Sequence, residues 1–283
     1  MKIIKLSGGL GNQMFQYAFG VALRHAGNEV LYDNFWYDEI NKSKKERATK
    51  RNYELAVFQA NVPLADAKQI KKCRREHFLG IRLFGFLRRL SSRVVKARIS
   101  RNYQSELLSL KNDAYLIGVF ANNTYFDDYR QELIRDFSLK EEMSAANLDM
   151  LNKIKETNSV SLHIRRGDYV KLGITCNLNY YYKAIDYICS QTENPHFYIF
   201  SDDVNWVRDN LKISHPHTFV DINDGKTGYF DMELMKNCRH NRTANSTFSW
   251  WAAYLNQNPQ KIALAPKDKD DDAFRLLFKG GYS

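Results

Sequence analysis

The chain has 283 residues, of which 44% are hydrophobic and 13% aromatic, and this length and composition are those of a soluble, globular protein with two ordinary domains. Lysine and arginine outnumber aspartate and glutamate by 42 to 32, and the formal charge of +10 favours an anionic partner: a nucleotide, a phosphorylated lipid, a membrane surface or a nucleic acid. There is no apolar run of about 18 residues, and glycines follow the N-terminus early, so we expect neither a membrane span nor a signal peptide.

The cysteines are scattered along the chain, with no CxxC pair and no histidine at a metal-ligand spacing. They are Cys73, Cys176, Cys189 and Cys238. This arrangement argues against a structural zinc site and against a disulfide framework. It fits a reducing cytoplasm, where we expect the protein to be located.

Short β-rich runs alternate with helical patterns, which predicts parallel sheets covered by helices on both faces. The predicted strands are residues 2–6, 29–33, 159–164, 197–201, 218–222 and 261–265. Between the first two runs, Met14, Ala18 and Val21 recur at helical spacing before a stop at Gly27, so residues 1–33 form a strand, glycine turn, helix and strand.

The second half repeats this plan, with helices near residues 180–190 and 229–238, a polar turn, and a further helix that ends before Pro259. Residues 40–150 are helical and charged, without a clear repeat. We place the boundary between the two domains at residues 148 and 149, in a polar, helix-prone stretch. Two α/β units in one chain predict a cleft between them.

The segment SLHIRRGDYV (161–170) ends a predicted buried strand on two arginines and an aspartate. In open parallel sheets, ligands bind beyond the carboxyl ends of the strands, where Arg165, Arg166 and Asp168 are placed. An arginine fork matches two phosphate oxygens at once, so this segment predicts a phosphate site. The alternative is a pair of surface arginines that happen to follow a strand.

Three other polar stretches also stand at predicted strand or helix ends. In GGLGNQ (8–13), the backbone N–H groups of Gly11 and Asn12 can converge on an anion at the start of a helix, although a tight turn without a ligand is the alternative. In ANSTFSWWAA (244–253), polar residues around Ser246 either cap a helix or bind an anion, or both. Asp202 and Asp203 follow a strand and either accept hydrogen bonds from guanine or cap the next helix.

Residues 81–101 carry seven cationic side chains and no acid. Their apolar residues share one side of a helical wheel and several arginines the other, so the segment resembles a basic amphipathic helix on an anionic membrane surface. A helix packed on its own domain is the alternative. No G-x-S-x-G, HExxH or strong DxD motif is present, so the sequence gives no support for a hydrolytic nucleophile or a catalytic metal.

Taken together, GGLGNQMFQYAFG (8–20), HIRRGDYV (163–170) and ANSTFSWWAAYL (244–255) resemble the α-1,2-fucosyltransferases of glycosyltransferase family 11. The resemblance implies a GT-B fold, with two facing Rossmann-like domains: an acceptor-side domain at 1–148 and a GDP-fucose-binding domain at 149–283. It also implies inverting transfer of fucose to the 2-hydroxyl of a galactoside, with no required metal or cofactor. Two segments depart from the family pattern: residues 118–126 lack a usual glutamine, and Arg242 replaces a usual aliphatic residue.

Carried over residue by residue, the resemblance implies catalytic roles for Arg165, Arg166 and Asp168 at the donor diphosphate. It implies donor-binding roles for Gly11, Asn12, Gln13, His163, Asp202, Asp203, Asn245, Ser246, Thr247 and Phe248. The general base is left unassigned: Asp168 and His163 are near the site, and each either takes part in the chemistry, orients Arg166 or holds the guanine. The partners expected are GDP-fucose and a galactoside or lipid-linked oligosaccharide, with peripheral contact to the inner membrane face through residues 81–101.

Two other functions are compatible with the sequence. One is a transferase of the same fold that uses a different acceptor or nucleotide sugar. The other is a non-catalytic basic module that binds nucleic acid, which requires exposed aromatic residues among the basic ones. We expect no nucleic-acid partner, because the aromatic-rich segment 248–254 reads as a buried helix.

Overall fold

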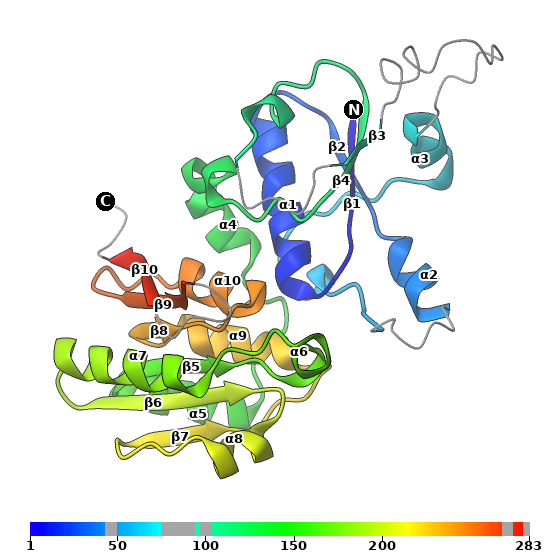
Figure 1. The fold of residues 1–283 in the computed structure, drawn as a ribbon. Helices are drawn as coiled ribbons and strands as arrows, with labels where there is room; N and C mark the ends of the chain where they lie inside the picture. Colours follow the sequence, from blue (N-terminus) through cyan, green and yellow to red (C-terminus); the bar gives the residue numbers. More distant parts are fainter. Residues whose placement is uncertain (43–49, 75–93, 97–102, 268–273, 280–283) are drawn as a thin grey trace. The chain divides into compact units, whose positions relative to one another are not determined.

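The computed structural model describes residues 1–42, 50–74, 94–96, 103–267 and 274–279. The chain divides into two compact units, unit 1 at Met1–Lys140 and unit 2 at Glu141–Ser283, and each is an α/β structure (Figure 1). The boundary predicted at residues 148 and 149 falls inside helix α5 (Ala145–Glu156), which belongs to unit 2. The cleft between the units stays a prediction.

Unit 1 is built on a four-stranded parallel sheet of order β2-β1-β4-β3. Its elements are β1 (Lys2–Lys5), α1 (Leu10–His25), β2 (Val30–Asp33), α2 (Trp36–Lys42), η1 (Leu55–Val57), α3 (Ala67–Arg74), β3 (Val94–Lys96), η3 (Ser105–Leu107), β4 (Ala114–Ile117), η4 (Asn123–Tyr125), η5 (Asp127–Tyr129) and α4 (Arg130–Asp136). The strand, glycine turn, helix and strand predicted for residues 1–33 are confirmed as β1, α1 and β2.

The α1 helix is buried almost all round, from Leu10 to Leu23. It packs so closely on β1 and β2 that a Cβ atom at Gly20 would collide with the Tyr32 side chain. The other face of the sheet packs on α3, where Ile3, Ile70, Cys73 and Tyr115 form one apolar cluster. Covering both faces of a parallel sheet in this way is what its uninterrupted apolar strands require.

Unit 2 is built on a six-stranded sheet of order β10-β9-β8-β5-β6-β7, in which only β10 runs antiparallel to its neighbour among the strands described. Its further elements are β5 (Asn158–Ile164), α6 (Gly167–Leu172), α7 (Leu178–Gln191), β6 (Pro195–Ser201), α8 (Val204–Asn210), β7 (His217–Val220), α9 (Gly228–Lys236), β8 (His240–Arg242), α10 (Thr247–Leu255), β9 (Ile262–Pro266) and β10 (Phe274–Lys279).

The central strand β5 is buried from Ser159 to Ile164, and its side chains alternate between the two faces of the sheet. Val160, Leu162 and Ile164 join the apolar cluster formed with α7. Ser161 lies on the opposite face, where its hydroxyl accepts a hydrogen bond from the Asn241 amide, which also donates to the Met235 carbonyl of α9. His163 shares this α9 face because it follows Ser161 by two residues.

The polar turn predicted between α9 and α10 is wrong, because β8 passes there through the middle of the sheet. Its sequence, HNR, has none of the apolar residues that mark a strand, yet all three residues are buried. The His240 Nδ1 accepts a hydrogen bond from the Ile262 backbone N–H, and Asn241 bonds to Ser161. Partners supplied by other elements therefore offset the cost of burying these polar side chains.

Of the basic segment at 81–101, only residues 94–96 are among those described, and they form strand β3 beside β4. The predicted helix is wrong at these three residues, and the rest of the segment lies outside the described residues. Within the described ranges, no helix combines the length and the apolar character needed to cross a bilayer.

Candidate functional site

The two arginines predicted to bind phosphate lie just beyond the carboxyl end of β5, before α6 begins at Gly167. Arg165 donates hydrogen bonds from Nη2 to Asp168 Oδ1 at 2.7 Å, and its Nη1 lies 3.0 Å from Asp202 Oδ2. Its side chain therefore links the first turn of α6 to the end of β6. This double ion pair holds Arg165 in one orientation.

The Arg166 guanidinium is held differently, by one carboxylate and one aromatic ring. Its Nε donates to Asp203 Oδ2 at 3.0 Å, and its central carbon lies 3.3 Å from the centre of the Trp206 ring. The terminal nitrogens Nη1 and Nη2 make no hydrogen bond with the described residues, although only 16% of the side chain is exposed. Arg166 thus presents a fixed pair of donors of the kind that binds phosphate oxygens.

Asp202 and Asp203 both bind the arginine segment. Asp202 Oδ1 accepts the Arg166 backbone N–H at 2.8 Å, and its Oδ2 pairs with Arg165. Asp203 pairs with Arg166 and also caps α8 by accepting the Trp206 N–H. Each of the four oxygens has one partner, and the cap predicted for α8 is confirmed at Asp203. The guanine role of these residues stays a prediction.

Gly167 allows this arrangement because a side chain there would not fit. A Cβ atom placed on Gly167 would collide with the Asp202 carboxylate. The glycine in HIRRGD therefore lets the start of α6 approach the end of β6, which brings Arg165 and Asp202 together. Asp168 pairs with Arg165 and not with Arg166, the residue it was predicted to orient. Its catalytic role stays a prediction.

His163, the last residue of β5 on the α9 face, is only 5% exposed, and its ring lies 5.8 Å from that of Phe248. Burial, with the positive charges of Arg165 and Arg242, lowers the pKa of His163 to about 3. The imidazole is therefore neutral at physiological pH. Its Nδ1 is buried and has no hydrogen-bond partner among the described residues.

The segment from Thr243 to Phe248 connects β8 to α10 and lies at the same edge of the sheet. Ser246 caps α10 by accepting the Phe248 N–H at 3.3 Å, as predicted, and Thr247 is the first residue of that helix. Asn245 donates from Nδ2 to the Ile174 carbonyl at 2.7 Å, but its Oδ1 is buried without a partner. The bond to Ile174 holds this segment against the loop after α6, while the Oδ1 acceptor of Asn245 stays available.

Buried polar atoms without partners are concentrated at this edge. Among the described residues, those found in side chains belong to His163, Arg242 and Asn245, all at the carboxyl ends of β5 and β8. An unpaired buried donor or acceptor costs about 1 to 3 kcal/mol, so native structures rarely keep one without a reason. A ligand or ordered water that supplies the missing partners is the simplest reason.

The predicted anion site in the glycine turn of unit 1 is not open in the same way. The amide of Gln13 is fully buried: it donates to the Gly8 and Asn52 carbonyls and accepts the Glu54 N–H at 2.8 Å. The backbone N–H groups of Asn12 and Gln13 bond to the Gly9 carbonyl, and Gly11 is buried in α1. The Leu10 N–H also interacts with the Glu54 carboxylate, so a protein carboxylate lies at the start of α1. The donor-binding role of Gly11, Asn12 and Gln13 stays a prediction.

Two residues at the edge of unit 2 were not predicted as site residues. Asp231, in the first turn of α9, accepts a hydrogen bond from Asn223 Nδ2 at 2.7 Å, and burial raises its pKa to about 6. Its other oxygen makes no hydrogen bond with the described residues. A carboxylate of raised pKa beside ligand-binding strand ends is a functional candidate, and its position in a first helical turn, like that of Asp168, was the available signal.

Arg242, which departs from the family pattern, is 1% exposed and carries two of the unpaired groups, Nε and Nη2. Its guanidinium lies 3.2 Å from the Tyr180 ring centre and 3.9 Å from that of Tyr181. Its Nη1 and the Tyr180 hydroxyl both donate to the Thr243 carbonyl. The two aromatic rings thus offset part of the cost of burying this cation. The two hydrogen bonds to the Thr243 carbonyl help to hold the segment before α10 in place.

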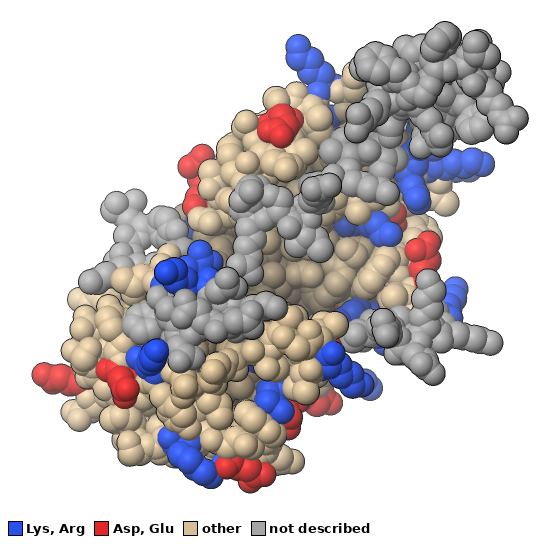
Figure 2. Space-filling model, in the orientation of Figure 1, with Lys and Arg blue, Asp and Glu red and all other residues tan. Residues whose placement is uncertain are grey.

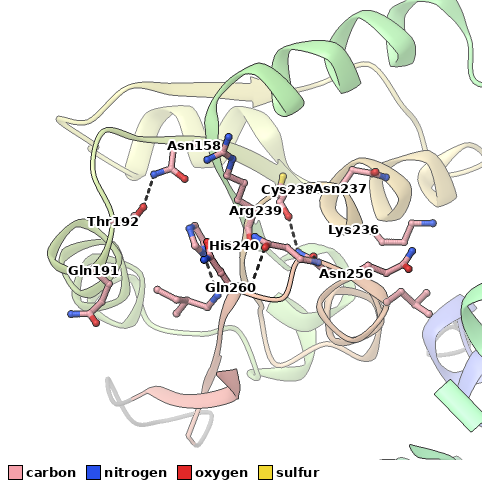
Figure 3. Close-up of a pocket in the computed structure, with 14 residues that line it drawn as sticks. Asn158, Gln191, Thr192, Lys236, Asn237, Cys238, Arg239, His240, Asn256 and Gln260 are labelled. Carbon is pink, nitrogen blue, oxygen red and sulfur yellow. Dashed lines mark hydrogen bonds between the residues drawn. The ribbon is translucent and has the colours of Figure 1, made fainter. Parts of the chain in front are cut away.

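The opposite, amino edge of the unit 2 sheet carries a pocket of about 620 Å³ (Figure 3). Its lining contains no carboxylate among the described residues and is rich in amides. These amides are largely used by the protein: Asn158 donates to Thr192, and Asn256 to the Cys238 carbonyl and to Asn241. The pocket lacks the unpaired groups of the carboxyl edge, so it is a weaker candidate.

A model of the family described as Glycosyl transferase family 11 matches residues 1–280. The chain belongs to this family. It is 32% identical to the O-antigen biosynthesis glycosyltransferase WbnK of Escherichia coli, over 93% of this chain and 92% of that protein. It is 31% identical to an alpha-1,2-colitosyltransferase of Escherichia coli, over 93% and 90%, and 29% identical to the galactoside 2-alpha-L-fucosyltransferase SEC1 of Bos taurus, over 58% and 48%.

Among solved structures, the NodZ alpha-1,6-fucosyltransferase soaked with GDP-fucose matches with a TM-score of 0.55 and 13% identity, over 98% of this chain and 99% of that one. A mutant of Arabidopsis thaliana FUT1 in complex with GDP matches with a TM-score of 0.50 and 9% identity, over 95% and 71%. At such identities the likeness shows the fold. The predicted α/β fold of GT-B type is thereby confirmed for this family 11 glycosyltransferase.

Proposed function

We propose that the protein is an inverting α-1,2-fucosyltransferase, which transfers L-fucose from GDP-fucose to the 2-hydroxyl of a galactoside. The family and its fucosyltransferase relatives support the reaction type. The observation that carries the donor side is the carboxyl edge of unit 2, where Arg165 and Arg166 meet buried polar atoms that lack partners. A nucleoside diphosphate offers both the anionic oxygens and the hydrogen-bonding groups that such an edge lacks.

In an inverting transfer, the acceptor hydroxyl attacks the anomeric carbon while GDP leaves, so negative charge grows on the β-phosphate. Arg166, fixed by Asp203 and Trp206, stabilises that charge with little reorganisation, because its donors are already oriented. Arg165 supports the site through its ion pairs with Asp168 and Asp202. Burial lowers the pKa of His163 to about 3, which argues against His163 as the general base near neutral pH.

We propose that Asp231, in place of Asp202 and Asp203, accepts the hydrogen bonds of the guanine base. Guanine presents an N1–H and an exocyclic amine, which a carboxylate accepts, and Asp231 has one oxygen without a partner among the described residues. Inosine diphosphate lacks the amine, so wild-type protein should bind GDP more tightly than inosine diphosphate. Asp231→Asn should remove most of that preference, measured by calorimetry. An unchanged preference would exclude this assignment.

We propose that the transfer needs no metal, since two arginines at the diphosphate provide the positive charge that Mg²⁺ supplies elsewhere. Within the described ranges, no group of three or more histidine, cysteine, aspartate or glutamate side chains is placed to hold a metal ion. Transfer should continue at its full rate in the presence of excess EDTA. Loss of the rate, with recovery on adding Mg²⁺ or Mn²⁺, would contradict this proposal.

The identity of the donor sugar also has to be tested, because one relative is an alpha-1,2-colitosyltransferase. Purified protein should be incubated with GDP-fucose, GDP-colitose or GDP-mannose across a panel of β-galactosides, and the products identified by mass spectrometry and NMR. We expect fucose transfer with an α-1,2 linkage. Faster transfer of colitose than of fucose would make the protein a transferase of the same fold that uses another nucleotide sugar. No transfer from any GDP-sugar would overturn both functions.

We also propose that the enzyme acts in the cytoplasm, on an acceptor presented at the inner membrane face during surface polysaccharide synthesis. The basic composition of residues 81–101 and the similarity to an O-antigen glycosyltransferase support this idea. On the face in view in Figure 2, the lysines and arginines of the described residues are spread between tan and red areas, unlike a nucleic-acid groove. Sedimentation with anionic liposomes at low salt tests the membrane contact.

A further inference from the structure

Unit 1 contains a pocket of about 470 Å³ at the carboxyl edge of its own sheet. Lys5 and Asp33, the last residues of β1 and β2, line it together with residues of α2 and α3. These two helices lie on the opposite side of β1 from α1 (Figure 1). The volume falls within the range of about 300 to 1,000 Å³ usual for ligand sites, and the carboxyl edge is where parallel sheets bind ligands.

Two aromatic residues give the pocket an apolar wall. Phe35 is 44% exposed, and Trp36 is half-buried beside it. The Trp36 ring meets the Tyr37 ring edge-on at 5.1 Å, and the buried Tyr37 hydroxyl donates to the Gly8 carbonyl. The aromatic wall is therefore fastened to the glycine turn of unit 1.

Charged side chains of both signs form the remaining walls. Lys5, Glu39 and Lys71 line the pocket, and none of them makes an ion pair with another residue in the described part of the chain. Arg74 lies over the Tyr115 ring, 5.0 Å from its centre. The pocket thus offers hydrogen-bond donors and acceptors around an aromatic surface.

The base of the pocket is rigid because Asp33 is fully used by the protein. Its Oδ1 accepts the Phe35 backbone N–H at 2.9 Å, and its Oδ2 accepts the hydroxyl of Tyr115. Asp33 is 4% exposed, so these bonds fix the turn from β2 into α2 and with it the position of Phe35. A site whose wall is held before the ligand arrives loses less entropy on binding.

We propose that this pocket binds the acceptor saccharide, with Phe35 and Trp36 against the face of a sugar ring and Lys5 and Glu39 at its hydroxyl groups. A pyranose ring has C–H groups on its faces and hydroxyl groups around its rim, which matches an aromatic wall bordered by charges of both signs. A nucleobase would also stack on these rings. The assignment to a saccharide rests on the proposed function, in which the nucleotide belongs to unit 2.

The test compares Trp36→Ala and Phe35→Ala with wild type in fucose transfer to lactose and N-acetyllactosamine. Each variant should raise the KM for the galactoside about tenfold, while the KM for GDP-fucose and the slow hydrolysis of GDP-fucose stay unchanged. Trp36→Phe should recover much of the acceptor affinity. Tyr103→Ala is the matched control, because Tyr103 is a 42% exposed aromatic of the same unit that does not line the pocket.

Galactoside binding to GDP-saturated protein, measured by NMR, separates this proposal from the proposed function. Weakened galactoside binding in Trp36→Ala, with GDP affinity retained, would support the pocket even if the transferred sugar were not fucose. An unchanged galactoside KM and binding in both aromatic variants would overturn the proposal while leaving the fucosyltransferase assignment intact. Wild-type protein that binds none of these galactosides would also overturn it.

Discussion

In unit 1, the turn after β1 uses its polar groups internally, whereas in unit 2 the segments after β5 and β8 leave buried groups unpaired. The Gln13 amide makes three hydrogen bonds within unit 1, and the Glu54 carboxylate lies at the start of α1. At the same edge of unit 2, His163 Nδ1 and Asn245 Oδ1 have no partner among the described residues. The two edges share a place in the fold but differ in their unused hydrogen-bonding capacity.

This difference shows that a position at a carboxyl edge does not by itself make a ligand site. The same edge can be closed by the protein's own amide and carboxylate groups, which stabilise a turn, or left incomplete for a ligand. Unit 1 instead has a pocket between α2 and α3, where Phe35 is exposed and where Lys5 and Glu39 make no ion pair with another described residue.

The largest effect should come from Arg166→Ala. Removing a donor aimed at developing charge lowers the rate by about 100- to 1000-fold, and we expect kcat/KM for GDP-fucose to fall by this much. Arg208→Ala is the control, because Arg208 is another unit 2 arginine that pairs with an aspartate and lies over an aromatic ring, Phe219. A fall of less than threefold in Arg166→Ala would mean that Arg166 does not contact the leaving group.

Sequence patterns predicted the fold where apolar runs mark the elements. The strands at residues 2–6, 29–33 and 159–164 are confirmed as β1, β2 and β5, because their burial follows directly from hydrophobic composition. The central strand β8 was missed, since HNR is buried through partners on β5, β9, α7 and α9. Tertiary partners of this kind are not visible in a local pattern.

The candidate site was predictable to a similar, limited extent. The placement of Arg165 and Arg166 beyond β5 followed from the strand pattern. The pairing of both arginines with Asp202 and Asp203 did not, because it depends on the register of β5 and β6, which aligns Ile164 with Ser201. The engagement of the glycine turn by Glu54 was likewise hidden, since that carboxylate comes from a distant part of the chain.

Gly167→Ala should give the next largest effect, because it disturbs the arginines without removing them. The added methyl group would displace the Asp202 carboxylate, which holds the Arg165 side chain and the Arg166 backbone. Small displacements of catalytic groups cost up to about 100-fold, and we expect transfer to slow by about 10- to 100-fold. Gly228→Ala, where no atom lies within 4 Å, should leave the rate unchanged.

If Gly167→Ala transfers fucose at the wild-type rate, the orientation set by Asp202 is not needed for catalysis. Catalysis at the carboxyl edge of unit 2 would then depend on the charge of the arginines and not on their orientation. A GDP affinity measurement on the same variant separates poor binding from poor chemistry.

Gln13→Ala tests the unit 1 side of the comparison. Removing three buried hydrogen bonds should lower the free energy of unfolding by about 3 kcal/mol, because the Glu54 N–H and two carbonyls lose their partner. Urea unfolding measures this change, and Gln59→Ala, at an exposed position, should stay within about 0.5 kcal/mol of wild type. Lost GDP affinity with unchanged stability would instead make the glycine turn a donor ligand.

The smallest effect concerns Asp231, because burial raises its pKa in the folded protein from the usual 3.8 of an aspartate to about 6. Between these values the folded state binds more protons than the unfolded state, so the free energy of unfolding falls as the pH rises from about 4 to about 6. The loss should be about 2 kcal/mol and complete above pH 6. Asp231→Asn keeps the acceptor for Asn223 but removes the charge, so this fall should disappear and the variant should be more stable than wild type at pH 8.

Urea unfolding at pH 4, 6 and 8 measures this difference, with Asp209→Asn, at an exposed position on α8, as the control. A variant that gains stability and loses its preference for GDP over inosine diphosphate would show that unit 2 keeps a destabilising buried carboxylate for binding. Unit 2 would then contain an unfavourable buried charge in addition to its unpaired polar atoms. Ligand binding would be the reason for both, at a cost in stability. If the pH dependence of Asp231→Asn matches that of wild type, Asp231 is ionised in the folded protein without cost, and its burial carries no functional meaning.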